Sequence, residues 1–136
     1  MPNILICGSR TIVSQPLVYF LIEAALPHLH LSNCNHTVIH GGARGVDTLA
    51  GNWAAQRGYT VEVRPAQWAQ HGKSAGYVRN AEMVALCDCA IALHDGVSRG
   101  TQHSINLCAQ AGKPCVVVVY DVAAHTYEVL VFDERK

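Results

Sequence analysis

Residues 37–47 read Thr-Val-Ile-His-Gly-Gly-Ala-Arg-Gly-Val-Asp, and this stretch decides the fold. Its first four residues are β-branched and apolar enough to form a strand, and Gly41 and Gly42 are placed to end that strand. The residues from Val46 to Arg57 have helical spacing, and Gly58 is placed to end that helix. A strand, a glycine-rich loop and a helix form the first half of a βαβ unit.

The same alternation of strand and helix continues on both sides of this segment. The other predicted strands are Asn3–Cys7, Thr60–Arg64, Cys89–Leu93 and Cys115–Tyr120, with one extra strand expected over Tyr127–Phe132. The predicted helices are Gln15–Leu26, Val46–Arg57, Ala75–Leu86 and Thr101–Ala111. This spacing is typical of a parallel sheet covered by helices on both faces. The sequence therefore predicts an α/β fold, a single Rossmann-like three-layer domain over residues 1–136 with a mainly parallel sheet.

Two features refine this picture. The strand at Thr60–Arg64 alternates apolar and polar residues, which is typical of a strand nearer a sheet edge. Two connections are long, Pro27–His36 and Pro65–Lys73, and the second is predicted to be a loop. Only the second follows a strand, so it is the candidate lid over a ligand. Ser14 is the expected N-cap of the first helix.

The composition limits the class of protein. Half of the 136 residues are hydrophobic and 15% are charged, which is enough apolar material for a core. Ten Lys and Arg balance ten Asp and Glu, and this neutrality argues against nucleic acid or a membrane surface as partner, because both need a basic face. No apolar run approaches the ~20 residues of a membrane span, and no signal peptide opens the chain. We expect a protein of the bacterial or infected-host cytoplasm.

The cysteines and histidines predict no metal site. The cysteines, which mostly sit in apolar segments without a C-x-x-C pair, are Cys7, Cys34, Cys87, Cys89, Cys108 and Cys115. We interpret them as reduced core residues. The histidines that could approach a site are His40, His71, His94 and His103, but no pair has the spacing of a helical metal motif. Trp53 and Trp68 are expected to pack in the core or the lid, and Trp68 could alternatively stack on a base.

Glycine-containing segments with one arginine each follow three of the predicted strands. They are Gly-Ser-Arg at residues 8–10, residues 41–47, and Asp-Gly-Val-Ser-Arg-Gly-Thr at residues 95–101. Loops after parallel strands gather at one edge of the sheet, so Arg10, Arg44 and Arg99 are expected to converge. Close backbone approach, helix N-termini and guanidinium groups together describe an anion site.

Each segment also has a purely structural interpretation. A glycine after a strand is ordinary turn chemistry, and Ser98 or Thr101 could simply cap the following helix. Asp47 could cap, form a salt bridge or accept a hydrogen bond from a ribose hydroxyl. Arg79 and Asn80 begin a helix, and their spacing alone favours a solvated face with Arg79 near Glu82 or Met83.

A family resemblance emerges from these motifs taken in order. Gly-Ser-Arg, residues 41–47, the run W-x-x-H-G-K-x-A-G-x-x-R-N-x-E-M from Trp68 and the run Ser98–Thr101 resemble the YAcAr-type branch of the SLOG superfamily, from about Ile4 to Val118. That superfamily includes DprA/Smf-type DNA-processing proteins, LOG phosphoribohydrolases and ligand-sensing domains of anti-phage systems. The resemblance implies a Rossmann-like fold, a homodimer or larger homo-oligomer, and a phosphorylated nucleotide-derived ligand such as an NAD or ADP-ribose derivative or a signalling nucleotide.

The resemblance also places the R-N motif in the site. The predicted ligand-binding residues are therefore Gly8, Ser9, Arg10, Gly41, Gly42, Arg44, Gly45, Asp47, Arg79, Asn80, Asp95, Ser98, Arg99, Gly100 and Thr101.

Comparison with LOG enzymes bears on catalysis. Arg79 is similar to their helix-borne arginine, and Gly100 and Thr101 are similar to their G-T pair. The glutamate of their P-G-G-x-G-T-x-x-E motif, however, falls on Ser104. Its absence argues against LOG-type hydrolysis, and the remaining catalytic candidates are Arg79, Glu82 and Asp95.

Three functions from different classes follow, in order of expectation. The first is a binding module that senses or sequesters a nucleotide-derived small molecule in phage–host defence, with no required cofactor. The second is a hydrolase of an N-glycosidic or phosphate bond in a nucleotide. The third is DNA processing, placed last because the neutral charge disfavours nucleic acid.

Overall fold

A computed structural model describes residues 2–31 and 36–133 of the chain. Its elements are, in order, β1 (Asn3–Gly8), α1 (Gln15–Ala25), the 3-10 helix η1 (Leu26–Leu29), β2 (Thr37–His40), α2 (Val46–Gln56), β3 (Thr60–Val63), α3 (Trp68–His71), the 3-10 helix η2 (Gly72–Ser74), α4 (Ala75–Leu86), β4 (Cys89–His94), α5 (Arg99–Gln110), β5 (Cys115–Asp121) and β6 (Thr126–Phe132). The α/β class and the alternation of elements are confirmed.

The strands form one six-stranded sheet in the order β3-β2-β1-β4-β5-β6. The first five are parallel, and β6 returns antiparallel to β5, so the predicted mainly parallel sheet is confirmed. From β1 the chain builds outward to β2 and β3, then crosses back to place β4 on the other side of β1. Ligands of open α/β sheets bind at the carboxyl ends of the strands where the order reverses, here between β1 and β4.

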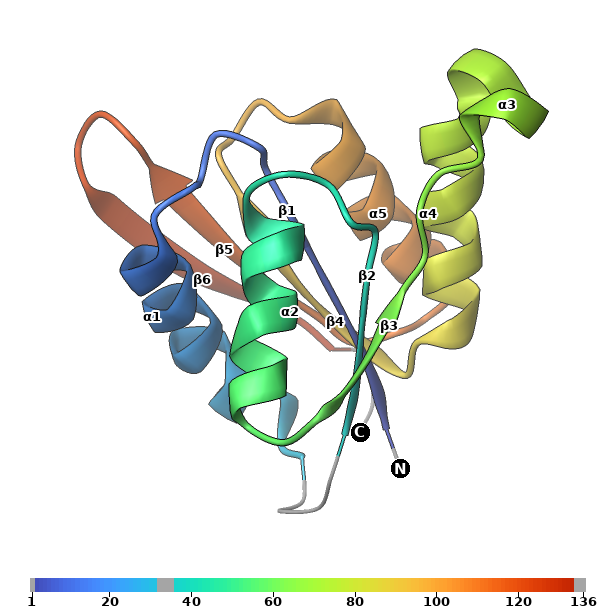
Figure 1. The fold of residues 1–136 in the computed structure, drawn as a ribbon. Coiled ribbons are helices and arrows are strands. Elements are labelled where there is room, and N and C mark those ends of the chain that lie inside the picture. The colour runs from blue at the N-terminus through green and yellow to red at the C-terminus, as the bar shows by residue number, and fades with distance from the viewer. Residues whose placement is uncertain (1, 32–35, 134–136) are drawn as a thin grey trace.

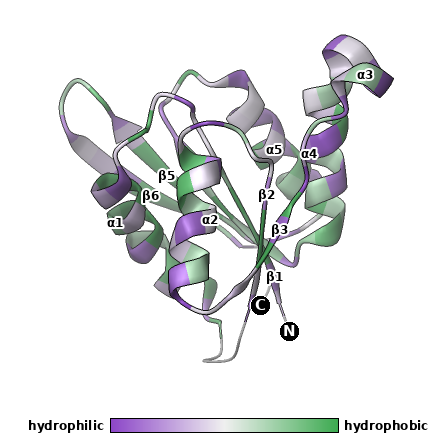
Figure 2. Cartoon of the chain, in the orientation of Figure 1, coloured by the Kyte–Doolittle hydropathy of each residue, from purple (hydrophilic) through white to green (hydrophobic). Residues whose placement is uncertain are grey.

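Helices cover both faces of the sheet (Figure 1). Because side chains alternate along a strand, Ile4 and Ile6 of β1 join the core beneath α1 and α2, whereas Leu5 and Cys7 join the core beneath α4 and α5. The buried strands β4 and β5 are the continuous apolar runs of the sequence, and Figure 2 shows the centre of the sheet as hydrophobic, whereas the helices carry both hydrophilic and hydrophobic residues.

Several element boundaries differ from the predicted ones by one or two residues, and the following differences concern connections and caps. The region Pro65–Lys73 is not a continuous loop, because the short helix α3 and the start of η2 lie within it. Helix α5 begins at Arg99 rather than at Thr101, since the Ser98 side chain accepts a hydrogen bond from the Thr101 N–H and caps the helix. Ser14 occupies the expected N-cap position of α1 but makes no side-chain cap bond.

The cysteines, the edge strand β3 and Trp53 were also subjects of prediction. The five described cysteines are buried, and Cys34 lies outside the described residues, as does part of the Pro27–His36 connection. Strand β3 is an edge strand, and Trp53 is buried in the core, both as predicted. None of the helices in the described ranges is both long and apolar enough to cross a membrane.

We predict that Gly8→Ala lowers the free energy of unfolding by roughly 1–3 kcal/mol, the usual effect of overpacking. A Cβ on Gly8 would lie 2.6 Å from Cγ1 of Val46 and 2.7 Å from the Leu93 carbonyl oxygen, so α2 or β4 must shift. Urea denaturation measures the difference. Gly100→Ala is the matched control, because a Cβ there meets no atom within 4 Å. Equal stability of Gly8→Ala and wild type would contradict this packing.

Candidate functional site

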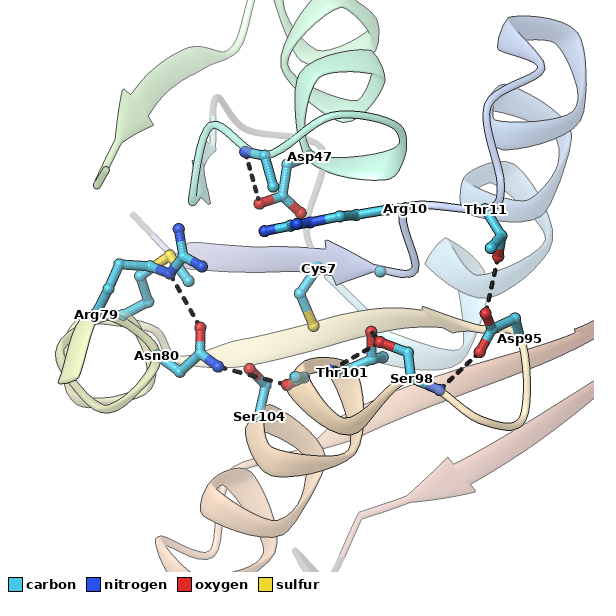
Figure 3. Close-up of a pocket in the computed structure, with 14 residues that line it drawn as sticks. Cys7, Arg10, Thr11, Asp47, Arg79, Asn80, Asp95, Ser98, Thr101 and Ser104 are labelled. Carbon is cyan, nitrogen blue, oxygen red and sulfur yellow. Dashed lines mark hydrogen bonds between the residues drawn. The ribbon is translucent and has the colours of Figure 1, made fainter. Parts of the chain in front are cut away.

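A pocket of ≈ 380 Å³ opens at the carboxyl ends of β1 and β4. Its lining residues are Cys7, Gly8, Arg10, Thr11, Ala43, Asp47, Arg79, Asn80, Met83, Asp95, Ser98, Gly100, Thr101 and Ser104. They come from the end of β1, from the loops after β1, β2 and β4, and from helices α2, α4 and α5 (Figure 3). The pocket therefore lies at the reversal of strand order, where the fold favours a ligand.

A buried carboxylate shapes the glycine loop that follows β2. Oδ2 of Asp47, which is 5% exposed, accepts the backbone N–H groups of Gly41 at 3.1 Å and Ala43 at 3.3 Å. The loop turns through positive φ at Gly42 and Gly45, a conformation that glycine adopts without strain. Asp47 is therefore a brace for the loop as well as part of the pocket wall.

Helix α4 is tied to the same loop by Arg79. Its Nη1 donates to the Gly41 carbonyl oxygen at 2.8 Å, and its Nε donates to Oδ1 of Asn80 at 3.0 Å. A Cβ on Gly41 would lie 2.4 Å from the Arg79 Nη1, so only a glycine leaves room for this guanidinium. The interpretation of Arg79 as part of a solvated helix face is wrong, because the side chain turns inward against the loop.

The loop after β4 is held by Asp95. Its Oδ1 accepts the N–H groups of Val97 and Ser98 at 2.9 and 2.8 Å, and its Oδ2 accepts the Thr11 hydroxyl at 2.8 Å. Burial would raise the pKa of Asp95, but these hydrogen bonds outweigh it and lower the pKa to about 2. Asp95 is thus an ionised structural acceptor with its oxygens engaged, and it holds no proton for acid catalysis near neutral pH.

Burial has the opposite outcome for Asp47. Loss of solvent raises the pKa of this carboxyl to about 6, although the Ala43 N–H, the Arg79 guanidinium, the Gly41 N–H and Arg10 all act to lower it. Burial and the nearby Asp47 also raise the pKa of the Cys7 thiol well above its usual value. Cys7 therefore stays a protonated thiol and is not a nucleophile in this pocket.

Positive charge and unpaired donors face this pocket from three directions. Arg10 extends across it toward Asp47, and Arg79 lies on the opposite side (Figure 3). The first N–H groups of α5 have no partner within the helix and carry partial positive charge. Gly100, in that first turn, lines the pocket beside Thr101, whose hydroxyl donates to the Ser98 hydroxyl at 3.1 Å. The pocket has the donors of an anion site.

Two histidines accept hydrogen bonds from the backbone of the loops that follow β2 and β4. The Nδ1 of His40, at the end of β2, accepts the Gly42 N–H at 3.0 Å. The Nδ1 of His94, at the end of β4, accepts the Gly96 N–H at 3.1 Å in the same way. Burial lowers the pKa of His40, which keeps this ring neutral and able to accept. Among the described residues no group of three or more His, Cys, Asp or Glu could hold a metal ion.

The structure brings together much of the predicted site but not all of it. The predicted residues that line the pocket are Gly8, Arg10, Asp47, Arg79, Asn80, Asp95, Ser98, Gly100 and Thr101. The predicted residues outside its lining are Ser9, Gly41, Gly42, Arg44, Gly45 and Arg99. The prediction that the loop arginines converge in one site is therefore wrong for Arg44 and Arg99, which are exposed and do not line the pocket. Arg79 of α4 faces Arg10 instead.

Sequence reasoning missed five residues of the lining, namely Cys7, Thr11, Ala43, Met83 and Ser104. Helical spacing could have found two of them, because Met83 lies one turn after Arg79 and Ser104 lies one turn after Thr101. The catalytic candidate Glu82 is exposed on α4 and does not line the pocket.

Three comparisons with known proteins bear on this site. The YspA, cpYpsA-related SLOG family matches residues 2–71. The Gene 61 protein of Mycobacterium phage D29 is 40% identical over 122 residues, which are 85% of this chain and 95% of that protein. DNA processing protein A from Helicobacter pylori, a protein described by its single-stranded DNA binding mode, has a similar solved structure, with a TM-score of 0.61 and 20% identity. The match covers 85% of this chain and 64% of that one, so the chain spans less than two thirds of it.

The last comparison corrects the expected function. A nucleotide-derived small molecule, sensed, sequestered or hydrolysed, was expected ahead of DNA, and nucleic acid was not expected as a partner. Both expectations are wrong, because the solved neighbour with this fold binds single-stranded DNA. The physical error is the use of net charge, a sum over the whole chain that does not report the charge at one edge of the sheet.

We predict that the pH dependence of stability identifies the buried carboxyl. Because the folded-state pKa of Asp47 lies above its ordinary 3.8, the folded protein holds this proton more tightly, and the free energy of unfolding falls as pH rises from about 4 to about 6. An asparagine at position 47 does not titrate, so the Asp47→Asn variant does not lose stability in this way as pH rises. The stability of the variant relative to wild type should therefore increase by about 2 kcal/mol between pH 4.5 and pH 7.5, as measured by urea denaturation.

Asp95→Asn is the matched control for this experiment. The folded-state pKa of Asp95 is depressed, so its stabilising effect is present above about pH 4 and is lost only as pH falls toward 2. This variant should be less stable than wild type by a nearly constant amount from pH 4.5 to pH 7.5. A pH-independent difference for Asp47→Asn would show that the Asp47 carboxyl is not perturbed.

Proposed function

This chain belongs to the YspA, cpYpsA-related SLOG family and resembles in fold a protein described by its single-stranded DNA binding, and we propose that it too binds single-stranded DNA, with one backbone phosphate in the pocket between β1 and β4. The observation that carries the proposal is the pair of guanidinium groups, Arg10 and Arg79, that face each other across this pocket beside the N-terminus of α5. Guanidinium forks and helix N-termini are the usual partners of phosphate oxygens.

The charge balance of the pocket favours an anion. Asp95 uses its oxygens in hydrogen bonds to Val97, Ser98 and Thr11, so this carboxylate is held within its own loop. The pKa of Asp47 of about 6 lets that carboxyl take up a proton more readily than an ordinary aspartate. A phosphate that enters between the guanidinium groups also favours the protonated form of Asp47 further.

An exposed aromatic side chain near the site suits a single strand better than a duplex. Trp68 of α3 is 58% exposed, and α3 stands beyond the carboxyl end of β3 (Figure 1). Its ring lies against the start of α4, where the position of a Cβ on Gly76 would be 3.9 Å away. The exposed Lys73 follows in η2. Proteins that bind single strands combine such cationic surface with aromatic rings on which unpaired bases stack.

Two further parts of the proposal concern its setting. The guanidinium and N–H groups supply the positive charge that phosphate needs, so we propose that DNA binding requires no metal or other cofactor. Cys7, Cys87, Cys108 and Cys115 are buried thiols, which suits a reducing compartment, and we propose that the protein acts in the bacterial cytoplasm, in the host cell if the gene is carried by a phage.

We predict that Arg10→Gln and Arg79→Gln each weaken binding of a fluorescent oligothymidylate roughly tenfold at low salt. Each loses one phosphate contact, so the slope of log affinity against log salt should fall by about 0.7 per substitution. Fluorescence anisotropy over a salt series, with and without a chelator, measures both quantities. Arg57→Gln is the control, because Arg57 lies at the far end of α2. The proposal fails if wild type shows no saturable binding, or if both site variants bind like wild type.

We predict that bound oligothymidylate quenches the fluorescence of Trp68. The sequence has two tryptophans, and Trp53 is 2% exposed in the core, so a signal change on binding is assigned to Trp68. Trp68→Phe should bind with similar affinity but show no quenching, whereas Trp68→Ala should lose about 1 kcal/mol or more of binding free energy. Unchanged quenching in Trp68→Phe would contradict a base at this position.

A further inference from the structure

A second hollow lies beside the phosphate pocket, on the outer side of α4 and α5. It measures ≈ 420 Å³ and is lined by Tyr77, Arg99, Gln102, His103 and Asn106. None of these residues lines the phosphate pocket, and Arg99 alone belongs to the site predicted from the sequence. The hollow therefore needs an explanation of its own.

Asn80 lines the phosphate pocket and contacts His103, which lines the second hollow, so this side chain connects the two hollows. Its Oδ1 accepts the Arg79 Nε–H at 3.0 Å on the phosphate side. Its amide nitrogen reaches the Gly100 carbonyl at 3.4 Å and Nδ1 of His103 at 3.3 Å on the other side.

An aromatic pair forms the floor of the second hollow. The Tyr77 ring is 48% exposed and meets the His103 ring edge-to-face, with centroids 4.5 Å apart. Burial lowers the pKa of His103, so this ring is neutral near pH 7 and its Nδ1 can accept from the amide of Asn80. The contacts hold His103 in place, and His103 in turn orients Tyr77 with much of its ring open to solvent.

The remaining lining residues suit a nucleotide. Arg99 is the one Lys or Arg among the residues that line this hollow, and its exposed side chain can reach a phosphate. The Gln102 side chain is held by hydrogen bonds to His94 at 3.1 Å and to Asn106 at 2.9 Å. The amide groups of Gln102 and Asn106 are therefore fixed in orientation. An open aromatic ring beside one guanidinium matches a planar base and its phosphate.

We propose that this hollow is a second nucleotide subsite, in which Tyr77 stacks on the base next to the nucleotide whose phosphate occupies the first pocket, while Arg99 contacts the connecting phosphate. This inference rests on the proposed function, and it adds the path of the strand, from Arg10 and Arg79 over Asn80 onto α5. Because every base has a flat face, the subsite tolerates all four bases.

The test compares two strands of equal length and charge, an oligothymidylate of about 12 nucleotides and the same backbone with abasic residues. We expect Tyr77→Ala to bind oligothymidylate about tenfold more weakly than wild type but to bind the abasic strand equally well. Tyr77→Phe keeps the ring and should stay within about twofold of wild type on both strands. Arg99→Gln should weaken binding of both strands and flatten the salt dependence, because it removes a phosphate contact.

Each result separates the subsite from the proposed function. If Tyr77→Ala weakens both strands equally, the tyrosine acts on the fold of the pocket and the stacking subsite is wrong. If Arg10→Gln and Arg79→Gln lose binding while Tyr77→Ala binds oligothymidylate like wild type, the subsite is again wrong but the proposed function stands. If wild type binds neither strand, the proposed function itself fails.

Discussion

The buried carboxylate of Asp47 fixes the geometry on which the site depends. It holds the glycine loop through the N–H groups of Gly41 and Ala43, and Arg79 reaches the carbonyl of the same Gly41 from another helix. Strand β2 and helices α2 and α4 are thus joined at one point before any ligand arrives. Such preorganisation reduces the entropy lost on binding. Two of the five guanidinium N–H groups of Arg79 are used in this framework, and the others remain to contact a ligand.

The fold followed from local patterns, whereas the site did so only in part. The periodicity of a strand or a helix is a property of residues that are close together in the sequence. The alternation of strands and helices, the edge position of β3 and the final strand could therefore be predicted. The direction of a side chain relative to distant elements is not local information. Arg44 lies in the glycine loop yet faces solvent, while Arg79 turns inward because α4 packs against that loop. The family resemblance, rather than spacing, identified Arg79.

Several formally charged side chains are engaged in hydrogen bonds inside the fold. The Asp95 carboxylate accepts hydrogen bonds from the Val97 and Ser98 N–H groups and from the Thr11 hydroxyl. Lys113 is likewise taken up by the carbonyl groups of Val84, Ala85 and Cys87 at the end of α4, at 2.6 to 3.0 Å. A net charge is a sum over the whole chain and does not report where the charges lie, so a chain that is neutral by count can still present cationic side chains at one edge.

The antiparallel direction of β6 determines where the chain can be extended. Strand β1 starts at Asn3, and β6 ends at Phe132, which pairs with Cys115 at the start of β5. Both strands therefore have their terminal ends at the amino edge of the parallel sheet, opposite the pocket (Figure 1). An affinity tag, a surface linker or a second protein fused at either end leaves the ligand edge open. The same arrangement suits tandem copies on one polypeptide, with every pocket facing away from the linkers.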